Sequence, residues 1–224
     1  MPRARGGHSE RASVPVAVAV IGAPSPAGPV ADAARAGAPV VRRAGRPGVL
    51  LDRDGTIIVD RGYVGTIERV ELIDGAADAI GRFNLAGVPV AVVSNQAGVA
   101  RGLFSVDDVE RVHRCIAGQL RACGAYVDRF LFCPYHPDGV VPAFARHSED
   151  RKPRPGMALA AAAALDLDLG ASWVIGDRAE DVGLAHAVGA EAIFVGPRPC
   201  PRPGATSLPS LAEAAALVLE RLAA

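Results

Sequence analysis

Five short apolar segments recur along the chain, and a stretch typical of a helix separates each from the next. The segments are 49–51, 88–93, 130–133, 173–175 and 192–195. Strands that alternate with helices are joined by right-handed crossovers, and helices then cover both faces of a parallel sheet. The alternation therefore predicts an α/β fold with a doubly wound parallel sheet of about five strands.

The intervening stretches carry recognisable helix boundaries. Asp74 is a candidate N-cap for a helix over 76–86, which Gly87 ends, and Ser105 is a candidate N-cap for a helix over 106–122. Three more helices are expected: one rich in alanine that ends near residue 167, one that ends at residue 188, and one from about residue 211.

Composition divides the chain into two parts. Residues 1–47 contain mainly Pro, Gly, Ala and Arg without periodicity, so we expect a low-complexity, disordered extension. Residues 48–224 carry the predicted strands and helices, and a hydrophobic fraction of 50% suffices for the core of one domain.

Charge and cysteine content restrict the partners and the compartment. Lys+Arg 24 balance Asp+Glu 24, so we expect no nucleic acid and no membrane surface as partner. The four cysteines form no C-x-x-C pair, which favours a reducing, cytoplasmic location. Residues 14–21 resemble a weak signal peptide behind three arginines, but Pro15 interrupts this apolar run.

The first predicted strand ends in the stretch Val49-Leu50-Leu51-Asp52-Arg53-Asp54-Gly55-Thr56. Side chains alternate along a strand, so Asp52 and Asp54 should face the same way. Open α/β sheets place their ligand crevices at the carboxyl ends of the strands. Two carboxylates there can attack a phosphorus atom and move a proton, or hold a divalent cation.

Further polar groups follow the other strands in order: Ser94, then Lys152, then Asp177 with Asp181. A phosphoryl group in transfer needs a nucleophile in line with it, and cations and hydrogen-bond donors around its oxygens. Asp52 can supply the nucleophile, Lys152 a charge and Ser94 a donor.

Magnesium fits the same set of residues. Asp52, Asp177 and the backbone carbonyl of Asp54 offer the oxygen ligands that Mg²⁺ prefers, with Asp181 in support. Without a cation, an anionic nucleophile would be repelled by an anionic phosphate.

Each feature taken alone has a simpler interpretation. The Asp52 to Gly55 segment resembles an acidic turn, and Asp177 with Asp181 resembles the acidic first turn of a helix. Arg151-Lys152 also fits a solvated basic corner. The ordered recurrence at successive strand ends favours one catalytic site.

Together these motifs resemble the haloacid dehalogenase superfamily of aspartate-nucleophile phosphatases. The resemblance implies a Rossmann-like fold with the first strand central and little or no cap domain. It also implies that Asp52 becomes the phosphoaspartate, and that Asp54 acts first as general acid and then as the base that activates water.

Several loops are similar to one branch of that family, whose members hydrolyse heptose 1,7-bisphosphate or histidinol phosphate. The quoted segments are Asp60-Arg61-Gly62-Tyr63, Ser94-Asn95-Gln96, Gly98 to Gly102, Cys133-Pro134 and Arg151-Lys152-Pro153. The residues that this resemblance implies for the substrate are Arg53, Asp60, Arg61, Gly62, Tyr63, Asn95, Gln96, Ala97, Arg151 and Arg178.

One motif of that branch is altered. Members bind structural zinc through a Cys-x-His pair and a later Cys-x-Cys pair. Here Cys133 remains, but the other positions are Tyr135, Ser148 and Asp150, so a thiolate-rich tetrahedral site cannot form as written. We expect a zinc-free loop; the alternative is a rearranged site in which His136, His147 and Asp150 join Cys133.

The sequence thus predicts a Mg²⁺-dependent phosphatase for a small phosphorylated sugar, acting as a monomer. Heptose bisphosphate is the favoured substrate, and histidinol phosphate or another phosphomonoester is the alternative. A non-catalytic binding protein on the same fold is a third hypothesis, which the intact Asp52, Asp54, Lys152 and Asp177 disfavour.

Overall fold

The computed structural model describes residues 45–197 and 199–224. Within them, a parallel sheet of six strands has the order β3-β2-β1-β4-β5-β6. The strands are β1 (Val49–Leu51), β2 (Val90–Asn95), β3 (Arg129–Cys133), β4 (Trp173–Gly176), β5 (Glu191–Val195) and β6 (Ala205–Leu208). The predicted α/β class, the parallel pairing and the central place of β1 are confirmed.

The expected number of about five strands omitted β6. This strand pairs in parallel with β5, with Ala192 opposite Ala205 and Val195 opposite Leu208. It is short, lies at the sheet edge and is at most partly buried, so it has no apolar run of the kind that marked the other strands.

The helices are α1 (Ala76–Leu85), α2 (Val106–Ala122), α3 (Gly156–Leu165), α4 (Ala179–Val188) and α5 (Leu211–Ala223). Short 3₁₀ turns cover Ile67–Arg69 and Leu169–Ala171. Ser105 caps α2 as predicted, because its hydroxyl accepts from the Asp108 backbone N–H in a capping box. Asp74 is not the N-cap of α1: that position is Gly75, in the left-handed region at φ +79.

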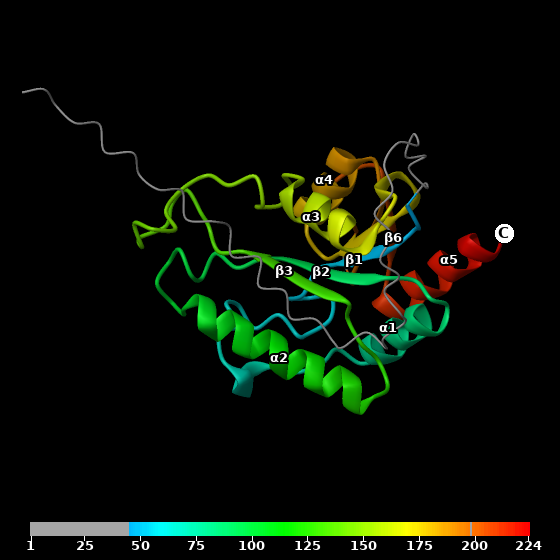
Figure 1. Ribbon diagram of the computed structural model, residues 1–224, viewed down its shortest axis with the longest axis horizontal. Coiled ribbons are helices and arrows are strands. Elements are labelled where there is room, and N and C mark those ends of the chain that lie inside the picture. Colours follow the sequence, from blue (N-terminus) through cyan, green and yellow to red (C-terminus); the bar gives the residue numbers. More distant parts are fainter. Residues whose placement is uncertain (1–44, 198) are drawn as a thin grey trace, which may run out of the picture.

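Helices cover both faces of the sheet. Figure 1 shows α3 and α4 on one side of the strands and α1 and α2 on the other, with α5 packed beside α1. Alternation along β1 feeds both layers: Val49 and Leu51 pack in the α1 and α5 layer, and Leu50 packs in the α3 and α4 layer. β1 is therefore buried on both faces. Its carboxyl end lies near the middle of the row formed by the carboxyl ends of the parallel strands.

Among the described residues, a contact with the domain is made before the expected boundary at residue 48. Arg46 forms an isolated parallel bridge with Leu167, and its backbone N–H donates to the Asp166 carbonyl at 3.0 Å. The sequence pattern missed this contact because it depends mainly on backbone pairing, to which the Arg46 side chain adds one bond from Nε to the Leu165 carbonyl at 3.4 Å. The rest of the expected N-terminal extension, residues 1–44, lies outside the described residues.

The described part of the chain contains neither a helix long and apolar enough to cross a membrane nor a separate cap domain. The segments after β1 and β3 are loops that surround the end of the sheet where the predicted site residues lie.

Candidate active site

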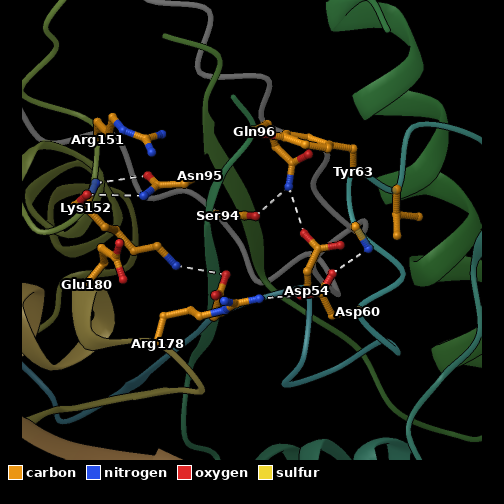
Figure 2. A pocket seen from close by; sticks show the side chains of 13 residues that line it. Asp54, Asp60, Tyr63, Ser94, Asn95, Gln96, Arg151, Lys152, Arg178 and Glu180 are labelled. Atoms are coloured by element: carbon orange, nitrogen blue, oxygen red, sulfur yellow. Dashed lines mark hydrogen bonds and ion pairs between the residues drawn. The ribbon is translucent and has the colours of Figure 1, made fainter. Parts of the chain in front are cut away.

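A pocket of about 360 Å³ opens at the carboxyl ends of the central strands. Side chains from the ends of β1 and β2, from the 60–64 loop and from the segments before α3 and α4 converge on it. The lining residues are Asp52, Asp54, Asp60, Gly62, Tyr63, Val64, Ser94, Asn95, Gln96, Arg151, Lys152, Arg178 and Glu180. Most of the residues chosen from the sequence thus share one cavity (Figure 2).

Lys152 joins two carboxylates at the floor of the site. Its Nζ lies 2.8 Å from Asp52 Oδ1 and 2.7 Å from Asp181 Oδ1, and all three side chains are nearly buried. Asn95 positions the lysine backbone: Asn95 Oδ1 accepts from the Lys152 N–H at 3.0 Å, and Asn95 Nδ2 donates to the Lys152 carbonyl at 3.2 Å. A fixed cation therefore stands beside the predicted nucleophile.

Burial changes the protonation of this group. Desolvation raises the pKa of Asp52 to about 7, although the nearby Lys152 charge opposes it. For Lys152, burial by itself lowers the pKa, but Asp181 and Asp52 outweigh it and the pKa stays above its ordinary value. Lys152 is therefore charged at neutral pH, and a further cation near Asp52 would hold that carboxyl ionised.

Asp54 has a different environment. Its two oxygens accept from the Arg53 guanidinium, from Nε to Oδ2 and from Nη2 to Oδ1, both at 2.9 Å. Gln96 Nε2 donates to Asp54 Oδ2 at 3.0 Å and to Ser94 Oγ at 2.7 Å, and Figure 2 shows this link between the two side chains. The Asp54 side chain keeps 21% of its surface exposed, so it remains accessible from the pocket.

A group of carboxylates beside the lysine could hold a metal ion. One oxygen each from Asp52, Asp177 and Asp181 lie within 4.8 Å of one another. Asp177 Oδ1 is buried and has no hydrogen-bond partner within the described part of the chain, as expected for an oxygen that can coordinate a cation. Gly55, at φ +84, makes this approach possible, because a Cβ there would lie 2.4 Å from Asp177 Oδ2. The residues present fit Mg²⁺.

Asp54 is predicted to contact the metal through its backbone carbonyl. The Asp54 carboxylate is outside this cluster and is held by Arg53, so only its backbone carbonyl remains for the predicted metal contact. Burial raises the pKa of Asp177 to about 6, and a bound cation would lower it again.

Arg178 links Asp177, a member of the carboxylate cluster, to Asp60 in the 60–64 loop. Its Nη2 donates to Asp60 Oδ2 at 2.5 Å, and its Nε lies 3.3 Å from Asp177 Oδ2. Asp60 Oδ1 in turn accepts from the Gly62 backbone N–H at 2.8 Å. Tyr63, at φ +49, is half-exposed at the pocket wall. This arrangement places the expected substrate loop over the crevice.

Three of the residues expected to contact substrate do not line the pocket. Arg53 has no exposed surface and lies beneath Asp54. Arg61 is turned to the outer surface, where it pairs with Glu71. Ala97 lies beyond Gln96, in the turn that follows β2. Alternation and motif position alone could not show which of these side chains faced the pocket.

Glu180 lines the pocket and was not chosen from the sequence. It lies in the first turn of α4, on the side of the site near Lys152 (Figure 2). The sequence pattern selects Asp181 in this acidic first turn. It therefore indicates the region of the helix start but not Glu180.

The loop after β3 does not fit a thiolate-rich zinc site. Cys133 is buried, and burial raises the pKa of its thiol. Tyr135, at the expected histidine position, packs against Phe144, with the two ring centroids 5.8 Å apart. The Arg146 Cζ lies 4.1 Å from the centroid of the Tyr135 ring. In residues 45–197 and 199–224, no group of three possible ligands forms around Cys133. The zinc-free loop stays a prediction.

Comparison with known proteins places this geometry in a family. A family model described as HAD-hydrolase-like matches residues 150–223. A D-glycero-beta-D-manno-heptose-1,7-bisphosphate 7-phosphatase of Rhodopseudomonas palustris is 46% identical over 144 residues, which cover 64% of this chain and 80% of the relative. The enzyme of the same name from Escherichia coli K12 is 39% identical over 177 residues, covering 79% and 90%.

The chain belongs to the haloacid dehalogenase-like family, in its heptose bisphosphate phosphatase branch. Among solved structures, a D,D-heptose 1,7-bisphosphate phosphatase from B. bronchiseptica, in complex with magnesium and phosphate, has a TM-score of 0.68 at 28% identity. The alignment covers 78% of this chain and 99% of that one. The predicted family membership and fold are confirmed.

Proposed function

We propose that the protein is a Mg²⁺-dependent phosphatase that removes the 7-phosphate from D-glycero-D-manno-heptose 1,7-bisphosphate. The observation that carries the proposal is the shared pocket in which Asp52, Asp54 and Lys152 meet beside the Asp177 cluster. The names of the relatives support the substrate, and they favour its β-anomer.

Two chemical steps follow from these positions. An Asp52 oxygen attacks phosphorus while Asp54, as the acid, gives its proton to the departing sugar oxygen. Asp54 is then a carboxylate, and it takes a proton from the water that attacks the Asp52 phosphoester. The first step consumes the Asp54 proton and the second step restores it, so phosphate leaves and both carboxyl groups recover their first state.

The remaining groups balance the charge of the phosphoryl oxygens. Lys152 supplies a fixed positive charge, and Ser94, 1% exposed at the end of β2, offers a hydroxyl. Asp52 and Asp177, with the Asp54 carbonyl and Asp181 in support, would hold Mg²⁺. When bound, this cation neutralises charge between the nucleophile and the phosphate.

The substrate is a sugar with charged groups at both ends, so contacts beyond the reacting phosphate are required. Asp60, Gly62, Tyr63, Asn95, Gln96, Arg151 and Arg178 line the pocket around the catalytic group. Carboxylate and amide groups suit sugar hydroxyls, and Arg151 suits a second phosphate.

The test is phosphate release by the full chain with Mg²⁺. The substrates are the α- and β-anomers of the heptose bisphosphate and histidinol phosphate, and the Asp52→Asn variant is the blank. We expect a preference for the β-anomer of at least tenfold, and no release above background from the variant. Equal turnover of all three compounds would contradict the substrate; release by the variant would contradict the aspartyl mechanism.

The protein is further proposed to act as a cytoplasmic monomer without a nucleic acid or membrane partner. The zero net charge supports the absence of a nucleic acid or membrane partner, and the four cysteines, which form no disulfide among the described residues, support the cytoplasm. The monomer follows from the family resemblance alone. Sedimentation velocity of the purified chain tests the monomer, and a dimer at micromolar concentration would contradict it.

A further inference from the structure

Arg53 was expected to bind substrate, but its side chain is the largest that is fully buried in the described residues. It reaches neither the pocket lining nor the solvent. A fully buried guanidinium is stable only when it is paired and hydrogen-bonded. Its partners therefore indicate what it does in this site.

The guanidinium contacts three parts of the site at once. It makes a bidentate ion pair with the Asp54 carboxylate. Its Nη2 also donates to the Val64 carbonyl at 3.0 Å and to Gln96 Oε1 at 3.1 Å. Val64 ends the 60–64 loop that borders the pocket, and Gln96 follows β2. Arg53 thus fixes the acid, the loop end and the amide to one rigid, planar group.

Counting acceptor sites shows which Asp54 oxygen is free to react. A carboxylate has about four lone-pair sites, two on each oxygen. Oδ2 accepts from Arg53 Nε and from Gln96 Nε2, so both its sites are filled. Oδ1 accepts from Arg53 Nη2 alone and keeps one site. This count leaves Oδ1 as the oxygen with a site for the proton that Asp54 gives and takes.

We propose that Arg53 is a positioning residue that, together with Gln96, holds Asp54 so that its Oδ1 performs the proton transfers. The inference rests on the proposed function, because it needs Asp54 as the acid and base. It assigns to Arg53 no contact with substrate.

The test uses substrates that differ in their need for an acid. An alkyl phosphate must receive a proton on its leaving oxygen, whereas p-nitrophenyl phosphate releases an anion that is stable near neutral pH. In the Arg53→Lys variant, the charge remains but cannot span both Asp54 oxygens. We expect kcat/KM for the alkyl substrate to fall roughly tenfold or more, since general acid catalysis contributes at least that much. We expect a loss of less than about threefold for p-nitrophenyl phosphate, whose reaction needs no acid.

Two further variants calibrate the result. Asp54→Asn should show the same dependence on the leaving group with a larger loss on the alkyl substrate. Arg111→Lys is the matched control: Arg111 is exposed on α2 and pairs with Asp108, so both substrates should keep their wild-type values. Equal losses on both substrates in Arg53→Lys, or no loss on either, would overturn the positioning role.

If Arg53→Lys fails to fold, Gln96→Met provides the second test. It removes the donor to Asp54 Oδ2, together with the Gln96 contacts to Arg53 Nη2 and Ser94 Oγ, and it keeps both hydrogen bonds from Arg53 to the Asp54 carboxylate. The alkyl substrate should again lose more than the aryl substrate, and equal losses would overturn the inference. Failure of the proposed function would be seen separately, as turnover that survives in Asp52→Asn.

Discussion

Two regions differ in how many family motif residues they keep: the carboxyl ends of the strands around the pocket, called here the catalytic edge, and the 134–150 loop. At the edge, every motif of the family is present, and the side chains meet within hydrogen-bonding distance. In the loop, three of the four zinc positions are replaced, yet Tyr135 is buried between Phe144 and Arg146. We propose that aromatic packing holds this loop in place of a ligand set, whereas phosphoryl transfer depends on particular atoms and tolerates no such exchange.

The largest expected effect concerns the edge. Lys152→Met leaves Asp52 and Asp181 buried without their cation. We expect kcat to fall by roughly 10³-fold, as when a charge-stabilising group is removed from other enzymes. Loss of one partner from a buried pair should also lower the free energy of unfolding by about 3 kcal/mol.

Steady-state kinetics and urea unfolding check this prediction. Arg154→Met is the control, since Arg154 is exposed and pairs with Glu149 at the surface. A Lys152→Met enzyme within tenfold of wild-type activity would show that the edge also tolerates replacement.

Removing metal should affect the two regions differently, because the carboxylates of the catalytic edge suit Mg²⁺ and the 134–150 loop is predicted to hold no zinc. Mg²⁺ at 100 times its dissociation constant should raise the free energy of unfolding by about 2.7 kcal/mol, because it binds only the folded state. The Asp177→Asn variant should lose most of this gain, since it weakens the carboxylate cluster. Zinc chelators should change neither stability nor activity. Thermal melts in Mg²⁺, with and without chelator, give the measurement.

A zinc stoichiometry near one, with a fall in melting temperature on chelation, would contradict the zinc-free loop. That outcome would favour a rearranged site with His136 and His147 beside Cys133.

The loop itself can be weakened by removing its aromatic anchor. Tyr135→Ala deletes a buried ring together with its contacts to Phe144 and Arg146. We expect a loss of about 3 kcal/mol in the free energy of unfolding. Tyr126→Ala, at a half-exposed ring, should cost less than about 1 kcal/mol and serves as control. Equal losses would mean that Tyr135 does not hold the loop.

The smallest expected effect concerns His113, which lies behind the catalytic edge. It is fully buried on α2, stacks on Phe130 at 4.9 Å, and neither ring nitrogen has a hydrogen-bond partner. Burial lowers its pKa well below the usual 6.5, so the folded protein keeps the ring neutral. Below pH 6.5 the unfolded chain binds a proton that the folded chain excludes, so stability falls as pH falls.

The His113→Phe variant should lack this contribution. Between pH 6.5 and the lower folded-state pKa, wild type should lose up to about 1.4 kcal/mol per pH unit relative to the variant. Comparing the two proteins removes the opposite contributions of Asp52 and Asp177, whose pKa values burial raises. Parallel stability curves from pH 7 to pH 5 would refute the buried neutral imidazole.

Much of the fold could be read from periodicity. Five strands and five helices were placed within a few residues, because buried parallel strands and capped helices have strong local signals. β6 and the Arg46 contact were missed, since both depend on backbone pairing at exposed edges. The α1 cap moved from Asp74 to Gly75, because the chain turns there through a left-handed residue that the pattern does not specify.

The sequence by itself determined the family, the order of the strands along the chain and the candidate catalytic carboxylates, because motif residues follow strand ends at fixed spacing. Only the tertiary structure decided which neighbours face the pocket. Arg53 lies under Asp54, Arg61 faces outward, and Glu180 enters the cavity. The reason is physical: spacing sets where a side chain starts, whereas burial and the partners brought from distant strands set where its charged end can lie.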